Sequence, residues 1–442
     1  MRIAVTLRRA AFAVLLALSF LSLSQVAGAE AKRAAELGRA EVRITAPVNE
    51  AARVTLPNSV HPKVARGEDL GRVDGATATG ALRLMLSAST AQEHDLQTLV
   101  DLQQDKNSDS FHKWIQPEEF GARFGASDAD IAKLTRWLSA HGFAVDHVAK
   151  GKRAIVFHGT VAQVEEAFAT EMHHIRVNGE DHMANTKPVN IPAAFAKVVA
   201  GVSRLNDFFP LQPHTPFAKA TRDSNGTWHS EFTSGGGGYY MAPGDFATIY
   251  NTQPLLNAGQ DGTGVTIGIV SWSEIPLTDV QTFRSLFGLK KNDPELDIIG
   301  TDQGIYYGGE GEAELDVEVS GAAAPGAHIL MATAPNTNTS DFLYSSLEYL
   351  VDSNRPDIIS ASVAECEEGT LGAASLVPYY EQAAAQGISV FASASDSGSD
   401  GCDDFDTATA GTTGYGVNGW SSTPYNTSVG GTMFDEGSNG SL

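Results

Sequence analysis

The sequence predicts two folded units, an α+β unit on an antiparallel sheet over residues 81–210 and an α/β unit with a parallel sheet over residues 239–442. Three observations support this division, besides a length of 442 residues, which favours two or three domains. Residues 235–442 hold 28 acidic and four basic residues, whereas residues 1–234 hold 25 and 26. A stretch rich in proline and glycine separates the two parts. Strand and helix patterns alternate beyond it, as in a parallel sheet covered by helices on both faces.

The first 29 residues have the pattern of a signal peptide. Three arginines near the start precede an apolar run at residues 11–23, and small residues at 27–29 offer a cleavage site. The run is shorter than the roughly 20 apolar residues that a membrane span needs. We therefore expect an exported protein, secreted or periplasmic, that is not held in a membrane. Residues 30–80 show little periodicity and are expected to form a loose lead-in.

Residues 81–210 alternate between strand and helix patterns. Leu134, Trp137 and Leu138 recur at helical spacing before Gly142, which is a typical helix-ending residue. Asn178-Gly179 lies between two strand patterns and favours a hairpin. The predicted strands are 82–89, 143–148, 154–158, 172–177 and 202–205, and the predicted helices are 91–104, one starting at 117, 128–141, 160–169 and 191–199.

Residues 211–238 are predicted to form a cleavable linker, because they combine prolines with the glycine run at 235–238. In the second unit, four apolar runs rich in β-branched residues read as buried parallel strands. Ligand sites in such sheets form at the carboxyl ends of the strands. The predicted strands are 264–272, 328–334, 357–363 and 387–395, and the predicted helices are one opening at 246–250, 340–351 and 373–386.

An acidic helix is predicted within residues 310–327, ended by a Pro-Gly pair. Glu312 and Asp316 lie one turn apart on it, about 5–6 Å between Cβ atoms. Two carboxylates beside apolar packing push each other's pKa values apart, which can yield a base that works in acid. The alternative is a solvated acidic face, because structural charge clusters are common.

Other groups of side chains have the composition of ligand sites. Four aspartates at 400, 403, 404 and 406 form an acidic loop whose spacing fits no EF-hand, so a solvated loop is favoured over calcium binding. His173, His174 and His182 lack a fourth ligand in recognisable spacing, so no metal site is predicted. The acidic second half makes nucleic acid an unexpected partner. Cys366 and Cys402 are expected to form one disulfide in an exported chain, the alternative being two free thiols.

Several stretches together resemble the kumamolisin/sedolisin family of secreted serine-carboxyl peptidases. The phrases FHKWIQPEEFGARFG, DADIAKLTRWLSAHGF and IPAAFAKVVAGVSRL resemble its activation propeptide. The phrases GVTIGIV, EAELDVEVSGAAAPGA, DIISASV and ASDSGSDG resemble the first half of its catalytic domain. The resemblance implies a ferredoxin-like propeptide domain followed by an incomplete subtilisin-like domain.

The resemblance also implies roles for three residues. Glu312 matches the catalytic base, Asp316 the carboxylate that orients it, and Asp396 the acid that donates to the oxyanion. A glutamate base and a protonated aspartic acid both suit chemistry at low pH. The protein is then expected to be an acid-acting endopeptidase zymogen with protein or peptide substrates, inhibited by its own propeptide until autoprocessing.

Some positions depart from the family pattern. No Gly-Thr-Ser segment, which carries the family's nucleophile, occurs before Leu442, and the family's calcium loop would lie beyond it. We therefore expect no nucleophile and no cofactor in this chain, and no peptidase activity from it alone. Ser271 and Val363 replace an acid and a tryptophan that extend the acid pair in some relatives, and Ser395 replaces a usual glycine before Asp396. A disulfide between the two cysteines would brace the Asp396 loop.

Two other functions remain open at this point. One is a non-enzymatic binding or inhibitor protein, or a truncated pseudoenzyme, with the propeptide-like unit as the functional part. The other is an ordinary subtilisin-type protease, disfavoured because the second unit contains no His-Gly-Thr segment. Eleven of the twelve histidines precede residue 235, which suggests that their protonation below about pH 6.5 weakens the contact between the two units.

Overall fold

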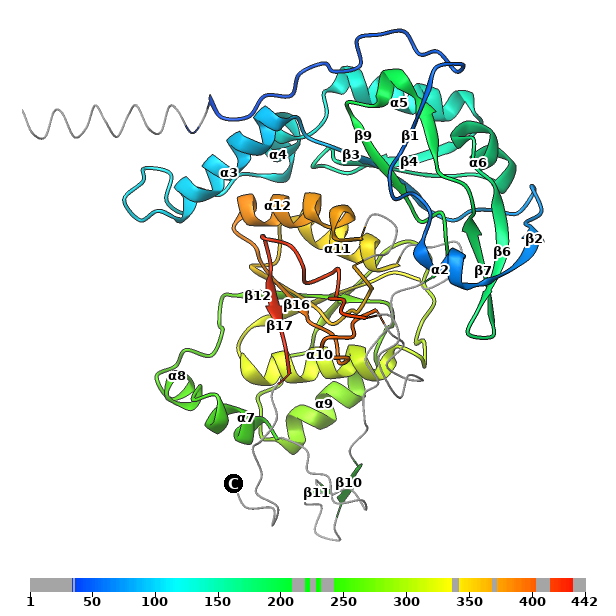
Figure 1. Ribbon diagram of the computed structural model, residues 1–442. Coiled ribbons are helices and arrows are strands. Elements are labelled where there is room, and N and C mark those ends of the chain that lie inside the picture. The colour runs from blue at the N-terminus through cyan, green and yellow to red at the C-terminus, as the bar shows by residue number, and fades with distance from the viewer. Residues whose placement is uncertain are drawn as a thin grey trace, which may run out of the picture.

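Two folded units stack on one another in the computed structural model (Figure 1). The structure describes residues 34, 36–208, 219–222, 228–231, 242–335, 342–367, 372–402 and 414–431. The predicted signal peptide at 1–29 and most of the predicted linker at 211–238 lie outside these ranges.

The first unit is built on a four-stranded antiparallel sheet with the strand order β4-β5-β3-β9. The chain order strand, helix, strand, strand, helix, strand with this arrangement is the ferredoxin-like pattern, which confirms the predicted fold class. Its elements are β3 (Leu82–Leu86), α3 (Thr90–Gln104), α4 (Pro117–Phe124), α5 (Asp128–Ala140), β4 (Ala144–Val148), β5 (Ala154–His158), α6 (Val161–Phe168) and β9 (Val199–Ser203).

Local sequence signals fix the ends of these helices. Ser89 accepts a hydrogen bond from the backbone of Gln92, whose side chain returns one to the Ser89 backbone, so a capping box begins α3. Ser127 caps α5 by accepting a hydrogen bond from the Asp130 backbone, without the reciprocal bond. The chain leaves α5 through Gly142 at φ +83°, a conformation that glycine adopts without strain.

A second, three-stranded sheet extends from this unit in the order β2-β6-β7. Strands β6 (Met172–Val177) and β7 (Glu180–Asn185) form a hairpin, and Asn178 and Gly179 at its tip both have positive φ. This confirms the hairpin predicted from the Asn-Gly pair, because two-residue turns of this kind require positive φ at both positions. Strand β2 (Glu68–Arg72) pairs with β6 from the other side.

The described part of residues 30–80 is not a loose lead-in, contrary to the prediction. It contains β1 (Arg53–Thr55), α2 (Pro62–Arg66) and β2, and Ile44, Leu56 and Val73 are buried in the core of the first unit. The segment shows no apolar periodicity because its elements are short and it contributes single apolar side chains to the core. The predicted helix at 191–199 is also wrong: β8 (Asn190–Pro192), which pairs with β1, and the single turn η1 (Ala193–Phe195) lead into β9.

The second unit contains a six-stranded sheet in the order β13-β14-β12-β15-β16-β17, in which every neighbouring pair is parallel. The four strands predicted from apolar runs form its centre, and two short strands at the edges were not predicted. The strands are β12 (Thr266–Ser271), β13 (Glu295–Ile298), β14 (His328–Thr333), β15 (Ile358–Ala361), β16 (Ser389–Ser393) and β17 (Thr427–Val429).

Helices cover both faces of this sheet, as predicted. Val317 of α10 packs with Ile269 and Met331 on one face, while Leu347 of α11 packs with Leu330 on the other. Helices α11 and α12 therefore lie between the sheet and the first unit, and α10 lies on the far side (Figure 1). The helices are α7 (Pro243–Ile249), α8 (Gln253–Asn257), α9 (Leu277–Leu286), α10 (Glu310–Ala323), α11 (Phe342–Ser353) and α12 (Val377–Gln386).

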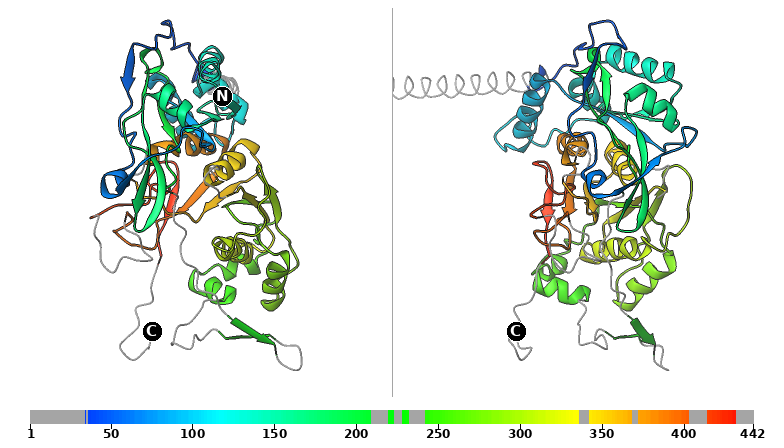
Figure 2. Two further views of the ribbon diagram at one scale, coloured as in Figure 1. Left: turned by 90° about the vertical axis from the view of Figure 1, so that its right-hand side faces the viewer. Right: turned by 45° about the vertical axis from the view of Figure 1, so that its right-hand side comes forward.

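The first unit rests on the outer surfaces of α11 and α12 (Figure 2). The backbone carbonyl of Ala385 accepts hydrogen bonds from the Gln103 side chain and the Ile115 backbone, at 3.0 and 3.1 Å. Trp114 lies against Gly387, where an added Cβ would come within 2.4 Å of the indole. Arg83 crosses to Glu348 of α11, with 2.5 Å between Nη1 and Oε2. The contact therefore combines backbone hydrogen bonds, close packing and a buried ion pair.

Among the residues that the structure describes, no helix has both the length and the apolar character that crossing a bilayer requires.

Candidate active site

Helix α10 carries the acidic residues singled out in the sequence. It spans Glu310–Ala323 and ends just before Pro325-Gly326, as predicted from the helix-favouring Ala, Glu and Leu residues. Gly309 precedes it, and the indole of Trp272 fills the space beside that glycine, so that an added Cβ would lie 1.6 Å from Nε1. Ala313 and Val317 bury one side of the helix against the sheet. This packing fixes how the acids of α10 are presented.

Glu312 and Asp316 lie on the same side of α10, next to the carboxyl end of β15. Glu312 is buried, with 6% of its surface exposed, and Asp316 is partly buried. The hydroxyl of Ser362, one residue beyond β15, donates a hydrogen bond to Asp316 Oδ1 at 2.6 Å. The alternative of a fully solvated acidic face is therefore not what this part of the helix presents.

The environment changes the acidity of Asp316. Burial raises the pKa of this carboxyl group, the negative charge of Glu312 raises it further, and the hydrogen bond from Ser362 lowers it. Because the charge of Glu312 contributes to this shift, the protonation of Asp316 depends on the charge of Glu312. Such a pair can accept and hold a proton under acidic conditions.

A second acidic group lies on the same helix and was not predicted. Burial, followed by the charges of Asp279 on α9 and of Glu310, raises the pKa of Glu314 to about 7. Burial, followed by the charges of Glu314 and Asp279, raises the pKa of Glu318 to about 8. Folding of this region is therefore favoured by acid, because these groups are more readily protonated in the folded state than in the unfolded chain.

Asp396 lies in the loop that follows β16 and is exposed. The preceding residue, Ser395, has φ +77°, a left-handed conformation that favours glycine. Ser395, which stands where the family pattern has glycine, therefore lies at a position where glycine would relieve strain. The turn itself forms with serine in place.

The strands that precede Ser362 and Asp396 are neighbours in the sheet, since β15 pairs with β16, so both chain segments leave it at the carboxyl edge. The hydroxyl of Ser393, at the end of β16, donates to the carbonyl of Val363 at 3.1 Å, and Val363 follows Ser362 directly. Asp316 is therefore linked to the end of β15 through Ser362. Asp396 follows the end of the neighbouring strand β16 by three residues. This is the edge at which parallel sheets form sites.

Cys366 and Cys402 form the expected disulfide. It joins the loop after β15 to the loop after β16, which contains Asp396. Their Cα atoms are 4.5 Å apart, and backbone bridges from Cys366 to Asn418 and from Asp400 to Gly416 support the same region. The disulfide therefore restrains the two loops that border the candidate site.

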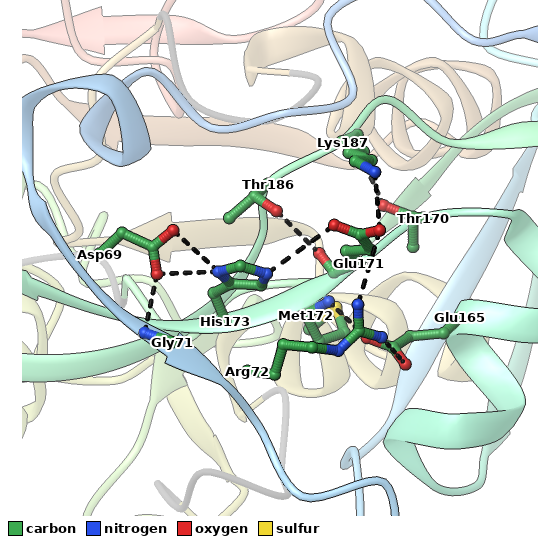
Figure 3. A network of polar contacts seen from close by, with 10 residues as sticks. All are labelled: Asp69, Gly71, Arg72, Glu165, Thr170, Glu171, Met172, His173, Thr186 and Lys187. Carbon is green, nitrogen blue, oxygen red and sulfur yellow. Dashed lines mark hydrogen bonds and ion pairs between the residues drawn. The ribbon is translucent and has the colours of Figure 1, made fainter.

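Two of the three histidines weighed in the sequence, His173 and His182, have other contacts. Figure 3 shows His173 held by Asp69, whose carboxylate oxygens lie 2.8 and 2.9 Å from Nδ1, with Glu171 3.9 Å from Nε2. His182 lies beside Phe208 and Asp207. Within the described ranges no three His, Cys, Asp or Glu side chains are grouped to hold a metal ion. Of the acidic loop only Asp400 is described, and residues 403, 404 and 406 lie outside those ranges.

Ser362 is the site residue that the sequence did not identify. It follows a strand in the phrase DIISASV, where a serine carries no recognisable signal, and only the pairing of β12 with β15 brings it to α10. Ser271 and Val363, the positions that extend the acid pair in some relatives, are both buried beside this edge. Neither of these side chains can titrate, so the pair is not extended through them.

Comparison with known proteins gave consistent matches. Residues 65–208 match the family described as "Pro-kumamolisin, activation domain". The chain is 32% identical over 297 residues to kumamolisin from Bacillus sp. (strain MN-32), covering 64% of this chain and 51% of that protein. It is 27% identical over 361 residues to sedolisin from Pseudomonas sp. (strain 101), covering 79% and 59%.

A third relative is xanthomonalisin from Xanthomonas sp. (strain T-22), at 25% identity over 401 residues, covering 82% of this chain and 47% of that protein. The chain thus spans about half the length of the curated relatives that it matches. A solved structure of Pseudomonas sedolisin (serine-carboxyl proteinase), complexed with two molecules of pseudo-iodotyrostatin, aligns with a TM-score of 0.36 at 27% identity, covering 45% of this chain and 55% of that one.

Proposed function

Since this chain belongs to the sedolisin family of serine-carboxyl peptidases and carries its pro-kumamolisin activation domain, we propose that it is the propeptide and first catalytic part of a secreted, acid-acting endopeptidase zymogen. The observation that supports this most strongly is the pair of Glu312 and Asp316, held beside the carboxyl edge of a parallel sheet with Ser362 donating to Asp316. Its substrates are proposed to be proteins or peptides.

In this proposal Glu312 is the general base that takes a proton from the nucleophilic serine. A general base is most effective when it titrates near the working pH, which a carboxylate does in acid. Asp316 then shares the proton and keeps the glutamate oriented, while Ser362 holds Asp316 in place. Burial of Glu312 supports the role, because a dry carboxylate binds a proton more strongly than a solvated one.

Asp396 is proposed to donate a hydrogen bond to the oxyanion of the tetrahedral intermediate. The group can donate only as a protonated carboxyl, which acidic conditions supply. Its place directly after β16, on a loop tied by the Cys366–Cys402 disulfide, supports a fixed donor position.

The first unit is proposed to act as the intramolecular inhibitor. Its contact with α11 and α12, through Arg83, Gln103 and Ile115, supports a propeptide that stays bound to the catalytic part until the linker is cut. Residues 1–29 are proposed to direct export.

We also propose that residues 1–442 alone do not cleave peptides, since no serine in the printed sequence lies in a Gly-Thr-Ser segment of the family kind. The proposal assigns no cofactor to these residues.

The test uses two proteins, the 442-residue chain and a version extended by the coding sequence that follows codon 442. Both are assayed for peptide cleavage between pH 3 and pH 7. The extended protein is expected to cleave only in acid, and Glu312→Gln to lower kcat by about 10²–10⁴. Asp396→Asn is expected to lower it by about 10²–10³.

Two results would contradict the proposal. Acid-dependent cleavage by the 442-residue chain that is lost in Glu312→Gln would show that the nucleophile lies within it. Full activity of the extended protein carrying Glu312→Gln would remove the glutamate from the reaction. Glu310→Gln, on the same helix, serves as the matched control.

A further inference from the structure

A single asparagine side chain joins the two strand ends that border the candidate site. Asn418 is buried, with 1% of its surface exposed. Its Nδ2 donates to the carbonyl of Val363 at 2.5 Å and to the carbonyl of Ser393 at 2.7 Å. Its Oδ1 accepts from the backbone N–H groups of Glu365 and Trp420, at 3.0 and 3.1 Å. One amide therefore binds four backbone groups from three segments.

The carbonyls that Asn418 binds are close to the proposed catalytic groups along the chain. Val363 directly follows Ser362, the residue that donates to Asp316. Ser393 lies at the end of β16, three residues before Asp396, and its hydroxyl also donates to the Val363 carbonyl. A shift of either strand end would displace Ser362 or the Asp396 loop.

The segment that carries Asn418 is itself firmly held. Trp420 is fully buried, its carbonyl accepts a hydrogen bond from the Tyr380 hydroxyl on α12 at 3.0 Å, and its ring lies 5.4 Å from that of Tyr344 on α11. The amide of Asn418 thus links the edge of the site to the helices on the opposite face of the sheet.

We propose that Asn418 is a positioning residue for the acidic site, holding the ends of β15 and β16 so that Ser362 meets Asp316 and Asp396 faces the same edge. The inference rests on the proposed peptidase function for its catalytic meaning. The geometric claim, that Asn418 sets the hydrogen bond from Ser362 to Asp316, stands on the contacts alone.

The chemistry of this position favours asparagine. The site needs two donors pointing at carbonyls and one acceptor facing two N–H groups, and a primary amide supplies both from one planar group. A leucine of similar size would leave four buried or partly buried backbone groups without this partner, and an ionised aspartate would offer no donor.

The test is a titration of Asp316 in the 442-residue chain. Aspartates are labelled with ¹³C at Cγ, and the Asp316 signal is assigned with Asp316→Asn. Ser362→Ala is expected to raise the midpoint of the Asp316 titration by about 0.5–1 pH unit, since the hydrogen bond from Ser362 lowers it. Asn418→Ala is expected to shift it in the same direction by at least half as much.

A matched control comes from the first unit. Asn185 is fully buried and donates to the carbonyls of Ser59 and Lys187, at 2.7 and 2.9 Å, so Asn185→Ala removes a similar amide far along the chain from the site. It is expected to lower stability and to leave the Asp316 midpoint unchanged. In the extended, active protein, Asn418→Ala is expected to lower kcat at least tenfold with KM within twofold.

Should Asn418→Ala fail to fold, Asn418→Ser is measured instead, because a small neutral side chain that admits a water keeps part of the network. The proposal is overturned if the folded variant leaves the Asp316 midpoint within 0.2 pH unit of the wild type, or if Ser362→Ala itself does not move it. Both titration midpoints are measured without peptide cleavage. An absence of peptidase activity would therefore contradict the proposed function and not the geometric claim.

Discussion

The buried ion pair between the two units gives the sharpest test of how the propeptide is held. Arg83 of β3 and Glu348 of α11 are both buried, with 1% and 5% of their surfaces exposed, and their charged atoms are 2.5 Å apart. The Tyr379 hydroxyl donates to the same Glu348 oxygen at 3.0 Å, and His147 Nε2 lies 2.5 Å from the other oxygen. We predict that Arg83→Met strongly destabilises the chain at pH 7, because it leaves a buried carboxylate.

The size of the effect follows from the state of Glu348. Burial alone would raise its pKa, but Arg83, His147 and Tyr379 together lower the pKa of this carboxyl from 4.5 to about 2. A lowering of this size corresponds to about 3 kcal/mol of stability, present above about pH 4.5 and lost as the pH falls toward 2. Removing one partner of a buried pair costs about 3–5 kcal/mol. We therefore expect Arg83→Met to lower the free energy of unfolding by about 3 kcal/mol at pH 7.

The measurement is urea unfolding of the 442-residue chain at pH 7 and at pH 3, with Arg83→Met, Glu348→Gln and the double variant. The double variant is expected to recover much of the loss, which gives a coupling energy of about 2–3 kcal/mol at pH 7. Arg176→Met is the matched control. It breaks the exposed pair with Asp181, at 2.6 Å, and is expected to cost far less stability than Arg83→Met, because solvent screens exposed charges.

A loss below about 1 kcal/mol in Arg83→Met, or no coupling in the cycle, would refute this reasoning. His147 makes the contact between the two units depend on pH in the opposite direction from the hypothesis that histidine protonation weakens this contact. The hydrogen bond to Glu348 raises the pKa of His147, so its contribution is fully present below about pH 6.5 and is lost as the pH rises. This histidine therefore strengthens the contact on mild acidification, and weakening by Glu348 begins only below about pH 4.5.

Three further predictions concern single features. Burial, followed by the charges of nearby basic residues, lowers the pKa of His61 to about 3. The free energy of unfolding should therefore fall by up to about 1.4 kcal/mol for each unit by which the pH is lowered from 6.5 to 3. In His61→Asn, urea unfolding should show a weaker dependence of this free energy on pH. Ser395→Gly should raise the free energy of unfolding by about 0.5–1 kcal/mol, and with it the melting temperature, because it removes a serine from a left-handed conformation. An unchanged or lower melting temperature would contradict this. Replacing Cys366 and Cys402 by serine should cost about 3–4 kcal/mol in urea unfolding for a loop closed over 36 residues, whereas a cost near zero would show that the loops are held by other contacts.

Elements with their own internal signals could be predicted from the sequence. The hairpin at Asn178-Gly179 and the capped helix α5 are set by local chemistry, and the central strand β12 by a continuous apolar run. The edge strand β13 could not be predicted, because Glu295 and Asp297 break its apolar pattern. Its pairing with β14 supplies the stability that the sequence does not display.

The candidate site shows the same division. Glu312 and Asp316 could be paired from helical spacing alone, since four residues make one turn. Ser362 and Asn418 could not be found, because each reaches the site through strand order and a long chain separation. The ordered segment before residue 80 was missed for a related reason: Asp130 binds the backbone of Arg43 and Ile44, a contact between positions far apart in the chain.

The packing of Trp114 on Gly387 places a constraint from one unit on the sequence of the other. Gly387 ends α12 at φ +80°, and any side chain there would also collide with the indole. The choice of residue at this position is therefore limited by the fit between the two units as well as by the turn itself. In a protein with the proposed function, a variant lost by substitution at Gly387 would be a failure of assembly, and better substrates would not restore it.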